Sequence, residues 1–203
     1  MPLVRKIELE NGFIALWQLD EEDDNLLSKL EFTGAEEHYL CQLTHSRRRR
    51  EWLTWHFMAR FFLGEDVQTG YNERGAPVLT NHEGFIGVSH SKEYVALYYN
   101  SEPCAIDIES VDRDYGVARR RILSQTELGL ANIADDRFLA LAWCAKEVAY
   151  KYAKAEGVDI LRDLVLSEID YEKSEIKVEL FGSNEITLRY DFFDHHCMAY
   201  TKE

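Results

Sequence analysis

The acidic residues Asp107 and Glu109 lie two positions apart in an otherwise apolar segment, residues 105–109. In a β-strand, the two-residue period places both carboxylates on one face and Ile106 and Ile108 on the other. Two neighbouring carboxylates repel each other unless a divalent cation lies between them. Their hard oxygen ligands suit Mg²⁺, which completes its coordination with water and substrate phosphate. In the alternative interpretation, the strand leaves the core here and its acids are simply solvated.

Charged residues also occur in the helical pattern of residues 137–155. Trp143, Glu147 and Lys151 are spaced four apart and so share one helix face, and Lys146 lies one step round from that face. Glutamate and lysine at this spacing commonly form surface ion pairs, which is the structural alternative. The surrounding residues are mostly apolar, however, so the helix should be largely buried. Charged groups in a buried setting need partners, which favours a role in a site.

Small hydroxyls and an imidazole meet at the end of a predicted strand, in the segment Gly87-Val-Ser-His-Ser. This segment is close to the Gly-x-Ser-x-Gly nucleophile elbow of serine hydrolases, but it lacks the last glycine and the strand-turn-helix context, so a hydrolase is disfavoured. Ser89 and His90 are better suited to hold a phosphate by hydrogen bonds. A structural histidine with satisfied hydrogen bonds is the alternative.

Two arginine clusters stand out in an acidic chain, at residues 47–50 and at Arg119, Arg120 and Arg121. Consecutive residues of a helix point in different directions around its axis. Most of these side chains are therefore expected in solvent, with one member of each cluster directed at a phosphate or an acidic protein. Nucleic-acid binding is disfavoured, because 37 acidic against 23 basic residues give a net charge of −14 and the clusters lack interleaved aromatic residues.

The composition bounds the class of protein. With 203 residues, 46% of them hydrophobic, the chain is long and apolar enough to fold around a sizeable core without disulfides or metal ions. The four cysteines lie far apart, as is typical of reduced core residues in a cytosolic protein. The chain start has no signal-peptide core, and the longest apolar runs are shorter than the ~20 residues of a membrane span. The sequence therefore predicts a soluble, cytoplasmic protein.

Both halves of the chain show the same order of elements, a long helix that ends near a glycine and then antiparallel strands. The expected helices are 35–43, 47–63, 115–123 and 137–155, and the expected strands are 13–19, several within 78–99, 105–108, 164–169, 176–181, 186–192 and 197–201. Because the strands cluster after the helices instead of alternating with them, the predicted fold class is α+β. The adjacent His195 and His196 would point to opposite faces of the last strand, so we interpret them as structural residues and not as metal ligands.

Three of these segments, in their order and spacing, resemble the 4'-phosphopantetheinyl transferase family, in its larger, pseudo-dimeric, surfactin-synthetase-activating type. The segments are 87–97, Ala105-Ile-Asp-Ile-Glu and Trp143-Cys-Ala-Lys-Glu-Val-Ala-Tyr-Lys. The last two are similar to the family's Gly-Ile-Asp-x-Glu strand and Trp-x-x-Lys-Glu-x-x-x-Lys helix. The resemblance implies two similar α+β halves, 1–102 and 103–203, related by a pseudo-twofold duplication, with the active site in the cleft between them.

The resemblance also implies roles for individual residues. Asp107, Glu109 and Glu147 would hold Mg²⁺ on the pyrophosphate of coenzyme A, the co-substrate. Lys151 would contact that pyrophosphate and assist the departing phosphate, and Lys146 would support the same charge. The nucleotide contacts would come from the first half, from Arg47, Arg74, Gly75, Pro77, Ser89 and His90. The carrier protein would be met by Arg119, Arg120 and Arg121.

The activity that the resemblance implies is transfer of the phosphopantetheine arm of coenzyme A to a serine of an apo acyl or peptidyl carrier protein. Glu147 would take the serine proton, directly or through a metal-bound water, and adenosine 3',5'-bisphosphate would leave. Ala105 and Ala76 replace a glycine and a lysine of the family pattern, and Arg74 is near enough in sequence to replace the lysine contact. The alternative is a catalytically silent module that binds coenzyme A or a carrier. Because a pseudo-dimer contains its own cleft, a monomer is expected.

Overall fold

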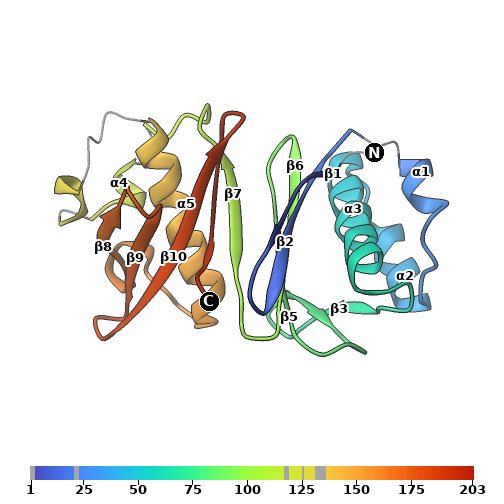
Figure 1. Ribbon diagram of the computed structural model, residues 1–203. Coiled ribbons are helices and arrows are strands. Elements are labelled where there is room, and N and C mark those ends of the chain that lie inside the picture. The colour runs from blue at the N-terminus through green and yellow to red at the C-terminus, as the bar shows by residue number, and fades with distance from the viewer. Residues whose placement is uncertain (1–2, 21–22, 117–118, 125, 131–135) are drawn as a thin grey trace. The chain divides into compact units, whose positions relative to one another are not determined.

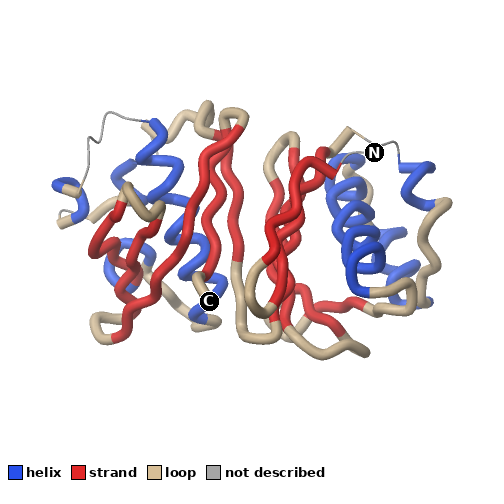
Figure 2. The backbone as a smooth tube through the Cα atoms, in the orientation of Figure 1, coloured by secondary structure: helices blue, strands red, loops and turns tan. Residues whose placement is uncertain are grey.

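The computed structural model describes residues 3–20, 23–116, 119–124, 126–130 and 136–203 (Figure 1). The chain divides into two compact units, Met1–Pro103 and Cys104–Glu203. In each unit an antiparallel sheet lies against one helix of 18 residues, α3 (Ser46–Leu63) in the first and α5 (Asp136–Ala153) in the second (Figure 2). The predicted α+β class is confirmed. No helix of the described ranges has the length and apolar character to cross a bilayer.

The first unit contains a four-stranded sheet in the order β1-β2-β6-β5. Its strands are β1 (Leu3–Glu8), β2 (Gly12–Gln18), β5 (Phe85–His90) and β6 (Tyr94–Asn100). Trp55, Met58 and Ala59 of α3 pack against the central strands β2 and β6. Gly12 is required at the start of β2, because a Cβ atom there would lie 1.9 Å from the carbonyl oxygen of Tyr99.

Smaller elements of the first unit contact α3 along its length. They are α1 (Asp23–Leu27), α2 (Gly34–Gln42) and the two-stranded ribbon of β3 (Thr69–Tyr71) and β4 (Pro77–Leu79). Thr33 begins α2 with a capping box, in which its hydroxyl accepts from Glu36 N and its own N–H donates to the Glu36 carboxylate. The ribbon turns at Gly75, whose φ of 75° is readily reached only by glycine.

The second unit contains a five-stranded sheet in the order β7-β11-β10-β9-β8. Its strands are β7 (Ile106–Ser110), β8 (Leu164–Asp170), β9 (Glu175–Leu180), β10 (Asn184–Phe193) and β11 (His196–Thr201), and its short helices are α4 (Arg119–Ile122), η1 (Glu127–Gly129) and α6 (Ile160–Asp163). Ala142, Ala145 and Ala149 are buried in α5, and their small side chains let the helix approach the sheet closely. β10 and β11 are joined by a tight turn with positive φ at Asp194 and His195.

The elements differ from the prediction mainly where the chain is polar. The first strand, β1, is absent from the prediction because it is an edge strand with most of its residues exposed, so it has no apolar alternation to detect. The helix expected at 115–123 begins at Arg119, and residues 117–118 of that prediction lie outside the described residues. Both long helices were predicted to within two residues, because their apolar residues follow the helical period.

Candidate functional site

The two acidic residues of β7 face α5. Asp107 pairs with Ala199 and Glu109 with Cys197 across the ladder to β11, and both of these partners belong to the core beneath α5. The Trp143 indole donates a hydrogen bond of 2.8 Å from Nε1 to Glu109 Oε1. The strand period places Glu109 on the face of β7 that meets α5, and the helix period places Trp143 on the facing side of α5. This hydrogen bond therefore joins the two predicted faces.

Lys151 makes the second connection between α5 and β7. Its Nζ lies 2.7 Å from Asp107 Oδ1 and donates to the carbonyl oxygen of Ile106 at 3.0 Å. Trp143 and Lys151 are two helical turns apart, and they contact acidic residues two positions apart in the strand. Glu147 occupies the turn of α5 between them, so the acidic residues of β7 and the helix face of Trp143, Glu147 and Lys151 are brought together.

The three carboxylates of this site influence one another. Burial and then the Asp107 charge raise the pKa of Glu147 above its ordinary value, while Lys151 acts in the opposite direction. Burial and then Asp107 likewise raise the pKa of Glu109. Carboxylate oxygens gathered in this way are the kind of ligand that a hard divalent cation takes.

Protein groups hold two of these carboxylates, so the donors do not form a preassembled cage. Among the residues described, no group of three or more His, Cys, Asp or Glu side chains is arranged to hold a metal ion. Arg113 Nη1 lies 3.1 and 3.2 Å from the two oxygens of Glu109, and Lys151 is bonded to Asp107. Binding of a cation would exchange these contacts for metal–oxygen bonds.

Sequence reasoning missed Arg113, which lies in the loop after β7. Its guanidinium lies 5.7 Å from the ring centre of Tyr115 and 5.9 Å from that of Trp143, while Tyr115 donates its hydroxyl to the carbonyl oxygen of Ser110. The aromatic rings thereby hold the arginine beside Glu109. Nothing in the local sequence distinguishes Arg113 from a solvated loop arginine.

The structure places Lys146 apart from the other charged residues of α5. Its side chain is 0% exposed, and its Nζ lies 2.8 Å from Glu127 Oε1 and 3.2 Å from the carbonyl oxygen of Ile160. The Glu127 carboxylate also accepts from the backbone N–H groups of Ser124 and Leu166. The ammonium is therefore occupied in the interior of the second unit and cannot also neutralise a pyrophosphate while this ion pair is intact.

In the first unit, a buried carboxylate gathers basic groups. Arg47 Nε lies 2.8 Å and Arg48 Nη1 3.2 Å from the oxygens of Glu51, and His90 Nε2 lies 3.4 Å from Glu51 and 2.8 Å from Arg48 Nη1. Arg47 also donates to the carbonyl oxygen of Ser91, which ties α3 to the end of β5. The single negative charge of Glu51 holds the two arginines in place. Because it balances only one of their two positive charges, the cluster can also bind a second anion.

A cavity of about 420 Å³ adjoins this cluster. Its lining combines aromatic rings, the basic cluster and the ribbon turn: Tyr39, Leu43, Arg48, Glu51, Trp52, Trp55, Tyr71, Gly75, Pro77, Val88 and His90. Of the expected nucleotide contacts, Gly75, Pro77 and His90 line it. Arg74 lies in the adjoining turn, where its backbone N–H donates to Asn72 Oδ1, and Ser89 points to the opposite face of β5.

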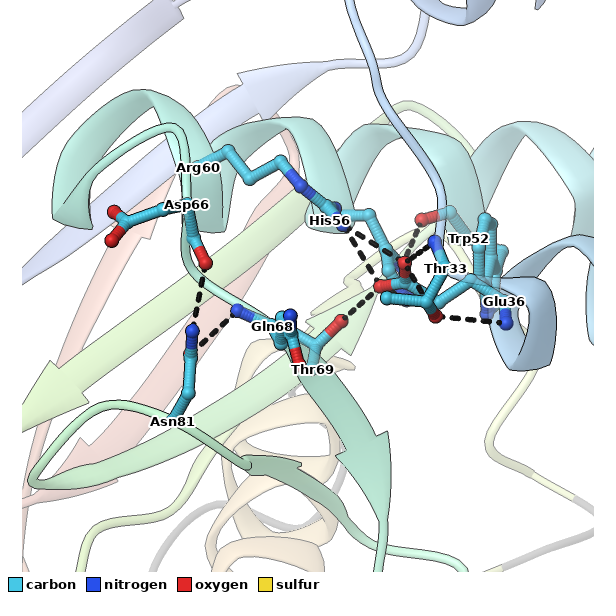
Figure 3. Close-up of polar contacts among 9 residues, drawn as sticks. All are labelled: Thr33, Glu36, Trp52, His56, Arg60, Asp66, Gln68, Thr69 and Asn81. Atoms are coloured by element: carbon cyan, nitrogen blue, oxygen red, sulfur yellow. Dashed lines mark hydrogen bonds and ion pairs between the residues drawn. The ribbon is translucent and has the colours of Figure 1, made fainter.

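His56 lies against both indoles that line this cavity. Its ring centre is 3.5 Å from that of Trp52 and 3.6 Å from that of Trp55. Its Nδ1–H donates to the carbonyl oxygen of Trp52 (Figure 3). Burial lowers the pKa of His56 well below 6.5, and Arg60 acts in the same direction. The folded protein therefore keeps this imidazole neutral in a pH range where the unfolded chain binds a proton.

This difference predicts acid sensitivity of the first unit. Because the folded pKa is depressed, the free energy of unfolding should fall as the pH drops below 6.5, by up to about 1.4 kcal/mol per pH unit for one proton. Urea unfolding at pH 7 and pH 5.5 measures this loss, which His56→Gln should reduce. Equal losses in the wild type and the variant would contradict the assignment to His56.

The arginines expected to bind the carrier lie in α4, where the backbone N–H of Arg119 donates to the carbonyl oxygen of Tyr115, whose ring lies beside Arg113. Arg119, Arg120 and Arg121 occupy α4, with Arg120 and Arg121 exposed. Their expected role stays a prediction.

Comparison with known proteins adds no further assignment. No protein-family model matches the chain, and the search of curated proteins found no match.

Proposed function

We propose that this chain is a 4'-phosphopantetheinyl transferase, which moves the phosphopantetheine arm of coenzyme A to a serine of an apo acyl or peptidyl carrier protein. The observation that carries the proposal is the pairing of β7 with one face of α5. Lys151 donates to Asp107 at 2.7 Å, and Trp143 donates to Glu109 at 2.8 Å. Glu147 lies between Trp143 and Lys151 on the helix. This arrangement concentrates three carboxylates and an ammonium, which is suited to phosphoryl transfer.

The proposed reaction forms one phosphorus–oxygen bond and breaks another. The serine oxygen attacks the β-phosphate, the bond to the departing adenosine 3',5'-bisphosphate breaks, and the serine proton passes to a base. Glu147 is the candidate base, because it lies between Trp143 and Lys151 on the helix face that meets the carboxylates of β7. Lys151 would place positive charge beside the departing phosphate. Mg²⁺, held by Asp107, Glu109 and Glu147, would supply charge neutralisation of the pyrophosphate.

The cavity of the first unit is the proposed site for the nucleotide end of coenzyme A. Its aromatic walls suit a planar base, and Arg48 and His90 at its edge suit a phosphate. Arg47 would contribute charge to the same end. In this proposal the protein acts as a cytoplasmic monomer, and an acidic carrier helix would contact the arginines of α4.

We also propose that the two units are diverged copies of one α+β unit. In each unit, one strand precedes the helix of 18 residues and pairs antiparallel with the last strand of that unit. The pair is β2 with β6 in the first unit and β7 with β11 in the second. This shared connectivity supports a duplication, although the sheets differ in their number of strands.

The activity is tested by incubating the purified chain with coenzyme A, Mg²⁺ and apo carrier proteins of the fatty-acid, polyketide, nonribosomal-peptide and siderophore classes. We expect at least one carrier to gain the mass of one phosphopantetheine. EDTA should abolish the gain, and excess Mg²⁺ should restore it. Absence of a mass gain on every carrier would refute the transferase.

A catalytically silent module that binds coenzyme A is the second candidate. The observation that favours it is that Lys151 and Arg113 hold the carboxylates of β7, without an assembled metal group among the residues that the structure describes. Such a module would gain thermal stability with coenzyme A but would transfer nothing. The carrier assay and a thermal shift on the same sample therefore separate the two candidates.

A further inference from the structure

A buried carboxylate in the first unit, Glu36, joins three elements. Its side chain is 5% exposed, and Arg60 Nη2 of α3 lies 3.0 Å from both of its oxygens. Thr69 Oγ1 of β3 donates to Oε1 at 3.1 Å, and Thr33 N, at the start of α2, donates to Oε2 at 2.9 Å (Figure 3). The second ring nitrogen of His56 lies 4.0 Å from Oε1.

The same three elements carry the aromatic walls of the cavity. Tyr39 follows Glu36 by three residues in α2, and Tyr71 follows Thr69 by two in β3, so each ring lies on the same side of its element as the network residue. The Tyr39 ring centre is 5.2 Å from that of Tyr71 and 5.9 Å from that of Trp52 in α3. The spacing of these rings depends on how α2, α3 and β3 are held together.

We propose that Glu36 is a positioning residue that fixes the walls of the aromatic cavity and so sets its affinity for the base and phosphate of a nucleotide. Buried ion pairs contribute little net stability over apolar packing, but they define one arrangement of the elements they join. A carboxylate with hydrogen-bond partners on three elements accepts only the geometry that satisfies all of them. The choice of nucleotide rests on the proposed function, whereas the connection through Glu36 rests on the contacts alone.

Thr69 offers the mildest way to test this connection. Thr69→Val removes only the hydroxyl that reaches Glu36 and leaves the pair with Arg60 intact, and Thr69→Ser restores the hydroxyl. We expect Thr69→Val to raise the Kd for adenosine 3',5'-bisphosphate, measured by calorimetry, by roughly three- to tenfold, as a small displacement of binding groups does. Thr69→Ser should stay within about twofold of the wild type. Glu36→Gln should weaken binding more strongly than Thr69→Val.

A control variant separates positioning from a general loss of stability. Val95→Ala removes buried atoms from the core beneath α3 without changing a residue that lines the cavity. Val95→Ala should lower the Tm as much as Thr69→Val or more, and yet leave the Kd for adenosine 3',5'-bisphosphate unchanged. In the transfer assay, Thr69→Val should raise the KM for coenzyme A and leave kcat unaltered.

Each result bears on the proposal. A higher Kd for Thr69→Val with recovery in Thr69→Ser supports it. An unchanged Kd for Thr69→Val, or equal weakening by Val95→Ala, would overturn the role of Glu36 while leaving the transferase standing. If the wild type does not bind adenosine 3',5'-bisphosphate, both the nucleotide site and its positioning residue are refuted, whatever the carrier assay shows.

Discussion

Glu147→Gln should reduce kcat for phosphopantetheine transfer by at least about a hundredfold, the scale of a lost general base. The amide keeps the shape of the side chain but neither accepts the serine proton nor offers a charged oxygen to a cation. Asp107→Asn should act in the same direction, because it weakens the same site and releases Lys151 from its 2.7 Å contact. Single-turnover assays at saturating coenzyme A measure this loss without contributions from product release.

The same variant should also be more stable than the wild type when no metal is present. Burial and the Asp107 charge raise the pKa of Glu147, so the ionised carboxylate is less favourable in the folded protein than in the unfolded chain at neutral pH. A neutral amide removes that penalty, and the stabilisation by added Mg²⁺ should shrink. Glu156→Gln, at an exposed position after α5, serves as the matched control. Full activity of Glu147→Gln would exclude Glu147 as the base.

Lys146→Met should have the largest effect on stability. The substitution leaves the fully buried Glu127 carboxylate without its cation, and breaking such a pair typically lowers the free energy of unfolding by about 3–5 kcal/mol. Urea unfolding monitored by circular dichroism measures the loss. In the double variant Lys146→Met with Glu127→Gln, the loss should be smaller than the sum of the single losses, because no isolated charge remains.

Transfer kinetics of the same variant distinguish the two roles considered for Lys146. If the lysine is occupied by Glu127, the folded fraction of Lys146→Met should show an unchanged KM for coenzyme A. If Lys146 instead contacts the pyrophosphate, the KM for coenzyme A should rise, because the variant lacks that charge contact. Measurements at low temperature, where the variant is folded, keep the two effects apart.

The parts of the site that could be predicted are those set by the repeat of side-chain direction within a single strand or helix. Alternation along a strand places Asp107 and Glu109 together, and a spacing of four along a helix places Trp143, Glu147 and Lys151 together. Each prediction needs only one element. The acidic strand face and the charged helix face then meet because the apolar residues of α5 pack that helix against the sheet.

The parts that were missed depend on contacts between distant segments. Lys146 lies one step round α5 from Glu147, and that step directs it toward η1 and α6. Glu127, its partner, comes from a segment without strong helix or strand signals. The network of Glu36 and Arg60 likewise joins residues 24 positions apart, with nothing in either local pattern to mark them as a pair.

The ladder between β7 and β11 sets the order in which the second unit can be assembled. The acidic strand opens this unit, yet its ladder partner is the unit's final strand, and β8, β9 and β10 lie between them in sequence. A chain emerging from the ribosome can form the β8-β9-β10 meander early, but Asp107 and Glu109 have no neighbouring strand until β11 is released. Such long-range pairing slows folding, since the intervening chain must be ordered first. The carboxylate site is therefore assembled only once β11 has paired with β7, after the β8-β9-β10 meander can form.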